Sequence, residues 1–116
     1  MPQGPRTARV SEEFREILAE AIQGLKDPRV GFVTVTGVKV SADLHVAWVY
    51  YTVLGDEKAK AGTRAALRSA APHLRRELGR QVRLKVTPEL RFEEDEVLAA
   101  GERIDQLLGQ VHDDDA

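Results

Sequence analysis

Cysteine is absent from this sequence of 116 residues, which excludes disulfides and zinc sites with thiolate ligands. Long apolar runs are absent as well. The most apolar stretch, residues 47–54, is less than half of the roughly 20 residues that a helix needs to cross a bilayer. The basic N-terminus is not followed by the apolar stretch of a signal peptide. We therefore expect a cytoplasmic protein with no membrane partner.

Catalytic motifs are also missing from the sequence. The only candidate nucleophiles of the usual kind are serines, and none of them lies in a nucleophile elbow. His45, His73 and His112 fall on different predicted elements, and no two of them have the spacing that holds a metal on one helix face. No glycine-rich phosphate-binding motif occurs. The sequence therefore predicts a protein that is not an enzyme and that needs no metal or other cofactor.

The apolar residues are sufficient for one hydrophobic core. Hydrophobic side chains make up 42% of the chain, and a chain of this length is too short for two independent cores. We predict a single domain over residues 1–111. The last five residues, His112–Ala116, are predicted to be a disordered acidic tail.

Hydrophobic periodicity predicts the first half of the fold. Apolar residues recur with helical spacing from Val10 to Leu25, and Pro28 sets the end of this helix because the residue before a proline avoids helical geometry. Two segments rich in β-branched residues follow, Phe32–Val40 and Leu44–Leu54. A short turn separates them, so they are expected to form a hairpin.

The next helix is predicted to begin at the capping residue Asp56 and to be interrupted by a proline. Pro72 lacks a backbone donor but is tolerated in a first helical turn. Ala70, Ala71 and Pro72 are therefore expected to form a kink between two helices, the second of which runs over residues 72–79.

A third strand and a last helix complete the prediction. Apolar residues alternate with largely basic ones over Val82–Phe92, which indicates a strand, and Pro88 suggests an edge position. A helix is predicted from Asp95, where acidic residues favour the positive end of its dipole. The expected class is α+β, with three strands and helices on one face.

Charge is distributed unevenly along the chain. Residues 56–92 contain ten Lys or Arg against four Asp or Glu, a net charge of +6, whereas residues 93–116 contain one Arg against nine acids, a net charge of −8. The first 55 residues carry six charges of each sign. A cationic segment in the middle of the chain is the feature that binding to a polyanion requires.

The order α-β-β-α-kink-α-β, with the basic residues on the kinked pair and the strand after it, resembles a type II KH domain. KH domains clamp single-stranded RNA with a G-x-x-G loop. Ala70-Ala71-Pro72 stands at the place of that loop here. Without that loop, we expect RNA to be bound through phosphate contacts from basic residues. These are Arg75, Arg76, Arg80, Arg83 and Lys85.

Five short motifs give a narrower resemblance. In chain order they are Lys26-Asp27-Pro28-Arg29, Thr34-Val35-Thr36, Val40-Ser41-Ala42-Asp43-Leu44, Leu74-Arg75-Arg76-Glu77-Leu78 and Pro88-Glu89-Leu90-x-Phe92-x-x-Asp95. With them, the chain resembles the bacterial ribosome-binding factor A family from about Arg6 to Leu108. In that family an Ala-x-Gly kink replaces the KH loop. Here Pro72 stands in place of the glycine, and Val97 in place of a serine.

The family resemblance implies an assembly factor that binds the immature small (30S) ribosomal subunit and its 16S ribosomal RNA. Such a factor supports late rRNA processing and maturation and matters most in the cold. A release GTPase and other assembly factors are further expected partners, and the chain is expected to be a monomer. The candidate RNA-binding residues are Arg6, Arg9, Arg29, Arg68, Arg75, Arg76, Arg80, Arg83 and Lys85, of which Arg29 is included only through the resemblance.

Two other classes of function remain open at this stage. The first is a protein-binding adaptor that presents its first helix or an edge strand and never contacts RNA, with the arginines forming only a solvated helix face. The second is a metal-dependent hydrolase or nuclease that uses the carboxylates of residues 93–96 and 113–115. Trp48, Tyr50 and Tyr51 are left out of the candidate site because aromatic residues on such a hairpin are more often part of the core.

Overall fold

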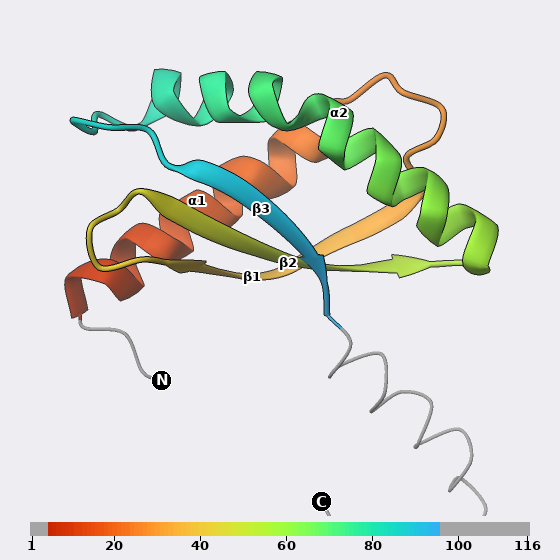
Figure 1. Ribbon diagram of the computed structural model, residues 1–116, viewed down its shortest axis with the longest axis horizontal. Helices are drawn as coiled ribbons and strands as arrows, with labels where there is room; N and C mark the ends of the chain where they lie inside the picture. The colour runs from red at the N-terminus through yellow and green to blue at the C-terminus, as the bar shows by residue number, and fades with distance from the viewer. Residues whose placement is uncertain (1–4, 96–116) are drawn as a thin grey trace, which may run out of the picture.

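The computed structural model describes residues 5–95, with side chains from Thr7 onward, as a three-stranded sheet with two helices on one face (Figure 1). The elements follow in the order α1 (Pro5–Gln23), β1 (Phe32–Val40), β2 (Val46–Leu54), α2 (Glu57–Gln81) and β3 (Glu89–Glu94). The predicted α+β class is confirmed. Neither of these two helices is long and apolar enough to cross a membrane.

The first helix buries the face that its periodicity predicts. Phe14 and Leu18 are fully buried and Ile22 is nearly so. Burial of a side chain of this size contributes about 1.5–3 kcal/mol of stability. The helix ends at Gln23, and the N–H of Gly24 still bonds to the Glu20 carbonyl at 3.2 Å. The predicted end of this helix is therefore close to the observed one.

Strands β1 and β2 form the predicted antiparallel hairpin. Its turn is stabilised by side-chain acceptors, because Ser41 Oγ accepts the Val46 N–H at 3.0 Å and Asp43 Oδ1 accepts the His45 N–H at 3.0 Å. Leu44 occupies the left-handed region in this turn, with a φ of 62°. A bulge interrupts the pairing between Val35 and Gly37.

Strand β3 pairs with β2 in parallel, so the strand order in the sheet is β1-β2-β3. Parallel neighbours require a crossover connection, and α2 with the loop after it provides that connection. Backbone bonds from Glu89 N–H to His45 O (2.8 Å) and from Asp95 N–H to Tyr51 O (2.7 Å) mark the two ends of this pairing.

One hydrophobic core lies between the sheet and the helices. It combines alternate residues of β2, including Val49 and Tyr51, with Phe14 and Leu18 of α1 and with three buried leucines of α2, which are Leu67, Leu74 and Leu78. Tyr51 is only 2% exposed, as expected for a core aromatic residue. Trp48 and Tyr50 alternate with the core residues and are therefore on the opposite face of the sheet, where they are partly buried.

The prediction of two helices joined by a kink is wrong as a count of elements. α2 is one helix that contains Pro72, although it changes direction near its middle (Figure 1). Proline removes one backbone hydrogen bond and its ring crowds the preceding turn, which bends a helix. Leu67 and Leu74 are buried on either side of Pro72, and this packing holds both halves of the helix against the sheet.

The third strand is shorter than predicted and begins later. Residues 82–88 form a loop, and only Glu89–Glu94 pair with β2. Two features explain the late start. Pro88 has no N–H to donate, and the carbonyls of Thr87 and Pro88 already accept hydrogen bonds from Arg75. The predicted last helix and the acidic tail lie outside the described residues.

Candidate nucleic-acid interface

Helix α2 presents a row of arginines opposite its buried leucines. The helix is capped by Asp56, whose Oδ1 accepts the Ala59 N–H at 2.9 Å. Leu67, Leu74 and Leu78 fix the rotation of the helix by packing into the core. The exposed side then carries four of the predicted contact residues, which are Arg68, Arg75, Arg76 and Arg80.

A groove lies beside the C-terminal half of α2. It has a volume of about 640 Å³, and the residues that line it are Pro72, Arg75, Arg76, Gly79, Arg80 and Thr87. A smaller hollow of about 220 Å³ follows toward β3, where Arg68, Ala71 and Arg91 are among the lining residues. Of the predicted kink residues, Ala71 and Pro72 thus line these hollows, whereas Ala70 packs against the core.

Arg75 shapes the groove and is not free to bind a ligand with its whole guanidinium group. Its Nη2 donates to the Thr87 carbonyl at 2.7 Å, and its Nε donates to the Pro88 carbonyl at 3.1 Å. Charge-assisted bonds of this kind are stronger than bonds between neutral groups. Arg75 therefore fastens the loop after α2 to the helix, a role that the sequence did not predict.

Gly79 allows the same loop to come close to α2. A Cβ atom at this position would lie 2.9 Å from Thr87 Oγ1, closer than side-chain carbons normally approach. The close approach of the loop to the helix at Thr87 therefore depends on the absence of a side chain at position 79. A glycine inside a helical segment is a sequence signal that could have indicated this close approach.

Arg68 and Arg76 are the cations of the row with the most freedom. Both are exposed, and within residues 5–95 no hydrogen bond or ion pair holds either side chain. Arg80 instead forms an ion pair with Glu77 on the preceding turn, although its side chain is 74% exposed. This hydrogen bond from Arg80 lowers the pKa of Glu77. An exposed pair is weak and can open to let Arg80 meet a phosphate.

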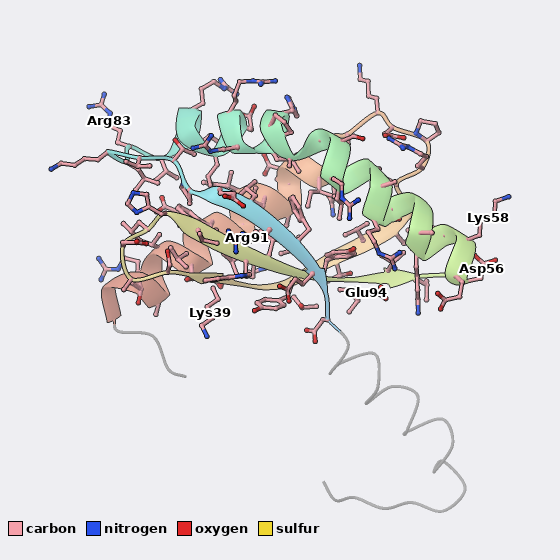
Figure 2. All side chains as sticks on the ribbon, viewed as in Figure 1. Lys39, Asp56, Lys58, Arg83, Arg91 and Glu94 are labelled. Atoms are coloured by element: carbon pink, nitrogen blue, oxygen red, sulfur yellow. The ribbon has the colours of Figure 1, made fainter. Side chains whose placement is uncertain are left out.

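Arg83 and Lys85 lie on the loop and not on a strand, contrary to the prediction. Both are exposed, and Figure 2 shows Arg83 extending from the loop into solvent. The loop follows directly on the C-terminal end of α2, so the two residues lie just beyond the arginines of the helix in the chain. The structure thus brings six of the nine predicted residues onto one helix and its adjoining loop.

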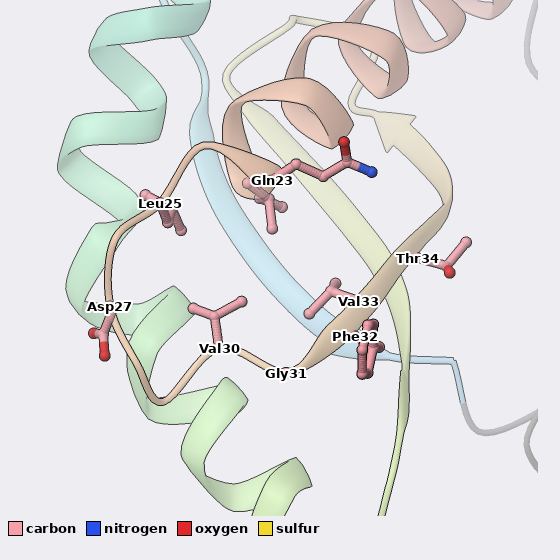
Figure 3. Close-up of a pocket in the computed structure, with 9 residues that line it drawn as sticks. Gln23, Leu25, Asp27, Val30, Gly31, Phe32, Val33 and Thr34 are labelled. Atoms are coloured by element: carbon pink, nitrogen blue, oxygen red, sulfur yellow. The ribbon is translucent and has the colours of Figure 1, made fainter.

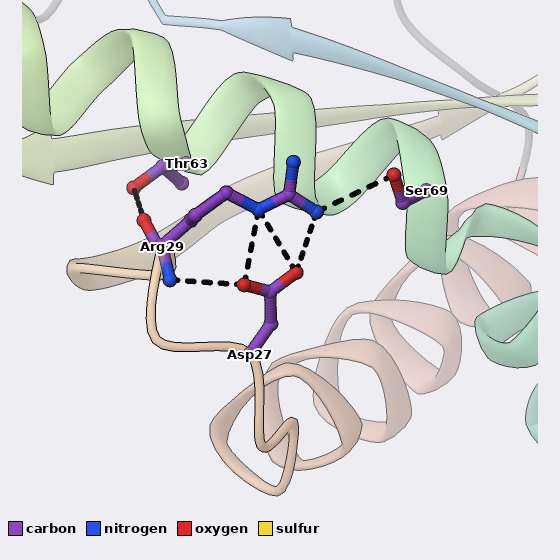
Figure 4. Close-up of polar contacts among 4 residues, drawn as sticks. All are labelled: Asp27, Arg29, Thr63 and Ser69. Atoms are coloured by element: carbon purple, nitrogen blue, oxygen red, sulfur yellow. Dashed lines mark hydrogen bonds and ion pairs between the residues drawn. The ribbon is translucent and has the colours of Figure 1, made fainter.

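Arg29 is held by its own turn (Figure 4). Its Nη2 lies 2.7 Å from Asp27 Oδ2, its Nε donates to Asp27 Oδ1 at 3.1 Å, and its backbone N–H donates to the same oxygen at 2.9 Å. These bonds lower the pKa of Asp27 to about 2. Ser69 of α2 lies 3.5 Å from Arg29 Nη2. The structure therefore assigns Arg29 a structural role in bracing the turn.

Of the two N-terminal arginines, Arg9 is not part of the α2 surface. Arg9 is exposed on α1, and the N-terminal end of α1 lies far from α2 in Figure 1. The backbone of Arg6 belongs to the same helix, whereas its side chain lies outside the described residues. Arg9 therefore lies apart from the basic residues of α2.

A pair of cations on the N-terminal half of α2 was also missed by the sequence analysis. Lys60 Nζ and Arg64 Nη2 each lie 3.7 Å from a carboxylate oxygen of Glu94 at the end of β3. These contacts tie α2 to the edge strand. In the described part of the chain, no three His, Asp or Glu residues gather into a possible metal site.

Comparisons with known proteins agree on one family. The family model described as ribosome-binding factor A matches residues 6–108. A ribosome-binding factor A from Geobacter sulfurreducens is 49% identical over 107 residues, which cover 91% of this chain and 91% of that protein. One from Anaeromyxobacter sp. strain K is 54% identical over 108 residues, which cover 91% of this chain and 78% of the relative.

Solved structures of the same name share the fold. The crystal structure of ribosome-binding factor A from Thermus thermophilus superposes with a TM-score of 0.70 at 35% identity, covering 76% of this chain and 93% of that one. A homology model of the Thermus thermophilus protein, fitted into a cryo-EM map of a 30S complex, gives a TM-score of 0.65 at 36% identity. It covers 75% of this chain and 92% of the Thermus chain.

Proposed function

Because the chain belongs to the ribosome-binding factor A family, a family of ribosome-binding factors and not of enzymes, we propose that it binds the small ribosomal subunit through RNA contacts of α2 and its loop. The fitted Thermus thermophilus relative supports this choice of partner, since it was placed in a 30S complex. The observation that carries the proposal is the set of exposed cations on α2 and the loop after it, which are Arg68, Arg76, Arg80, Arg83 and Lys85.

The charge of this segment favours a polyanion. Between Arg64 and Lys85 the chain contains seven Lys or Arg and one acid, Glu77, which is a net charge of +6. Phosphate contacts by such residues supply most of the affinity for a folded nucleic acid and set its orientation. No catalytic group is needed, since a protein that prefers one RNA conformation shifts the equilibrium toward it.

The proposed role is late maturation of the small subunit. Binding to immature 30S particles would support processing of 16S ribosomal RNA, with the largest effect in the cold, where misfolded RNA escapes slowly. We propose that the chain acts in the cytoplasm as a monomer and leaves the subunit with the help of other assembly factors, including a GTPase. The fold is then a KH-like domain of type II, in which the bend of α2 takes the place of the G-x-x-G loop.

Co-sedimentation with purified 30S subunits tests this proposal. Arg76→Glu should lower the bound fraction at least fivefold, because it replaces an exposed cation of the groove by an anion. Lys58→Glu makes the same change of charge at the other end of α2, far from Arg83 in Figure 2, and should leave binding nearly unchanged. Both residues are exposed, so the thermal unfolding of both variants should resemble that of the wild type.

Equal losses in the two variants would show a response to net charge alone. No loss in either would reject the α2 surface as the site and would favour the adaptor function.

A further inference from the structure

The side of the sheet that points away from the helices has aromatic side chains on β2. Val49 and Tyr51 are buried against the helices, so the residues that alternate with them point to the other side, which we call the open face. Trp48 and Tyr50 lie on the open face and are partly buried. Both helices lie on the opposite side of the sheet (Figure 1), so no element within residues 5–95 covers the open face.

Strand β1 leaves space beside Tyr50 on the open face. Gly37 is paired with Tyr50, and a Cβ atom at Gly37 would meet no atom within 4 Å other than those of the adjacent residues. Figure 3 shows the start of the same strand, where Thr34 points away from the helices and Val33 points toward them, beside a hollow of about 380 Å³. A glycine within a strand marks a place where another element can approach the backbone closely.

The end of β3 brings the chain to this open face. Asp95, the last described residue, continues the pairing with β2, since its N–H donates to Tyr51 O at 2.7 Å. Its Oδ2 accepts the hydroxyl of Thr36 on β1 at 2.8 Å. Burial, together with the nearby carboxylates of Glu93 and Asp95, raises the pKa of Tyr50. The Asp95 carboxylate thus lies beside Tyr50, and the chain continues to residue 96 from the open face.

The sequence that follows Asp95 has the pattern of an amphipathic helix. Six apolar residues of the segment 96–111 recur every three or four positions, which is typical of one side of a helix. They are Val97, Ala100, Ile104, Leu107, Leu108 and Val111. Gln106 and Gln110 fall on the opposite side. The six residues therefore form an apolar stripe that needs a surface to bury it.

Length and position favour the part of the open face around Trp48. A helix over residues 96–111 is about 24 Å long. From the level of Tyr51, where Asp95 pairs, β2 extends by about 17 Å back to Val46 and by only about 10 Å forward to Leu54. A helix that turns back over Tyr50 and Trp48 therefore covers the longer part of the face and both aromatic rings.

The charges of the open face disfavour RNA as its occupant. Lys39 and Arg91 flank Trp48 in the register of the sheet. Arg91 is paired with Glu89 at 2.8 Å, and the carboxylates of Glu93 and Asp95 lie on the same face. Three acids against two cations repel phosphates rather than attract them. A segment that carries both signs beside its apolar stripe fits better, and Arg103 and Asp105 flank Ile104 in this way.

We propose that residues 96–111 bind to the open face of the sheet of the same chain as an amphipathic helix. The apolar stripe packs on Trp48 and Tyr50 and into the space beside Gly37, while Gln106 and Gln110 face solvent. Burial of apolar surface on both sides stabilises the contact, and the short connection at Asp95 gives the segment a high effective concentration. The sheet then lies between two layers of helices. This contact does not depend on the proposed RNA binding, because α2 lies on the other side of the sheet.

Fluorescence of the full chain tests the proposal, because Trp48 is its only tryptophan. Ile104→Asp combined with Leu108→Asp should lower the equilibrium constant for docking of the segment about 100-fold, since the burial of two large apolar side chains is lost. Trp48 should then emit at longer wavelength and be quenched more strongly by acrylamide. Gln106→Asp combined with Gln110→Asp adds the same charge on the opposite side of the helix and should change neither property.

Nuclear Overhauser effects test the contact itself in the wild type. They should connect the methyl groups of Ile104 and Leu108 with the rings of Trp48 or Tyr50. The milder pair Ile104→Ala and Leu108→Ala should change the fluorescence in the same direction as the aspartate pair but to a smaller extent. Circular dichroism verifies that all variants fold.

Equal fluorescence of the wild type and the Ile104 and Leu108 aspartate variant would overturn the contact, as would equal changes by the two aspartate pairs. Emission that shifts when the wild type is diluted would show that a second copy covers Trp48 instead. Quenching of wild-type Trp48 by a uridine oligonucleotide would show that RNA binds there, and either result overturns the proposal. Because 30S binding by α2 is measured separately with Arg76→Glu, a failure here does not count against the proposed function.

Discussion

At the scale of the residue, Arg75 and Arg76 show how neighbouring side chains of one type divide their tasks. Arg75 lines the groove and donates hydrogen bonds to the carbonyls of Thr87 and Pro88. Arg76 is exposed and makes no such bond within the described residues. The first therefore builds the surface, and the second is available to bind at it. The sequence predicted the positive charge of both residues but not this difference in their contacts.

Thr63 connects α2 to the loop after α1, and its hydroxyl is the part that matters. The residue is fully buried, Gly31 N–H donates to its Oγ1 at 3.0 Å, and its Oγ1 donates to Arg29 O at 3.4 Å. Thr63→Val keeps the shape but leaves the Gly31 donor without a partner, which should lower the free energy of unfolding by about 1–3 kcal/mol. Urea unfolding measures the loss.

The control for this substitution is Thr63→Ser, which keeps the hydroxyl and should retain more of the stability than valine does. If serine were the more damaging of the two, packing of the methyl group and not the hydrogen bonds would be the main contribution of Thr63.

Asp27 should make stability depend on acid. Its pKa is about 2 in the folded chain, below the ordinary value of 3.8, chiefly because the Arg29 side chain donates hydrogen bonds to it. The folded state then binds fewer protons than the unfolded state between about pH 4 and pH 2. The contribution of Asp27 is present above pH 4 and is lost as the pH falls through that window.

Urea unfolding of the wild type and of Asp27→Asn, at pH 5 and at pH 2.5, measures this contribution. The wild type should lose more stability between the two pH values than the variant, which has no carboxyl group at position 27. Equal losses would mean that the Asp27–Arg29 pair is as strong in the unfolded chain as in the folded one.

At the scale of the element, the accuracy of the sequence prediction followed the range of the contacts involved. The first helix and the hairpin have apolar patterns set by their own residues and a turn of suitable chemistry, so the end of the helix and the bounds of the hairpin were nearly correct. The helix begins at Pro5, before the apolar pattern that starts at Val10. The start of β3 depends on Arg75, which is distant from it in sequence, and the alternation in residues 82–88 carried no sign of this. For the site, the exposure of the arginines on α2 was predicted, whereas the anchoring of Arg75 to the loop required the tertiary structure.

Pro72 lies in the interior of α2 and is exposed, so it costs stability without contributing to the core. Pro72→Ala restores a backbone donor for the turn and should raise the free energy of unfolding by about 1–3 kcal/mol. It should also straighten the helix and separate Arg68 from the groove around Arg76. We therefore expect higher thermal stability together with weaker 30S binding in the same preparation.

A variant that gains stability and binds 30S subunits as well as the wild type does would show that the bend serves only to fit α2 to the sheet. Ala71→Gly provides a matched control, since it changes the neighbouring residue but supplies no backbone donor at position 72.

At the scale of the whole molecule, the charges are distributed unevenly over the elements. The basic residues gather on α2 and its loop, and the exposed acids Glu16 and Glu20 lie on α1. The near-neutral total of −2 conceals this division.

Salt should weaken 30S binding steeply. If about four cations of the α2 surface neutralise phosphates, the logarithm of the association constant should fall with the logarithm of salt concentration at a slope of about −3. Filter binding or sedimentation from low to moderate salt gives the slope. Arg76→Glu should make it shallower by about one, and a wild-type slope near zero would contradict binding through phosphates.

The parallel pairing of β3 with β2 also sets the order in which the nascent chain can fold. The hairpin closes through a short turn, but β3 reaches β2 only after the crossover of residues 55–88 has been synthesised. Pairing across so long a connection is slow. Until it forms, the β2 edge with the backbone of Ala47, Val49 and Tyr51 is open to pairing with other chains. The interval between synthesis of Leu54 and of Glu94 is therefore the stage at which this chain is most prone to aggregate.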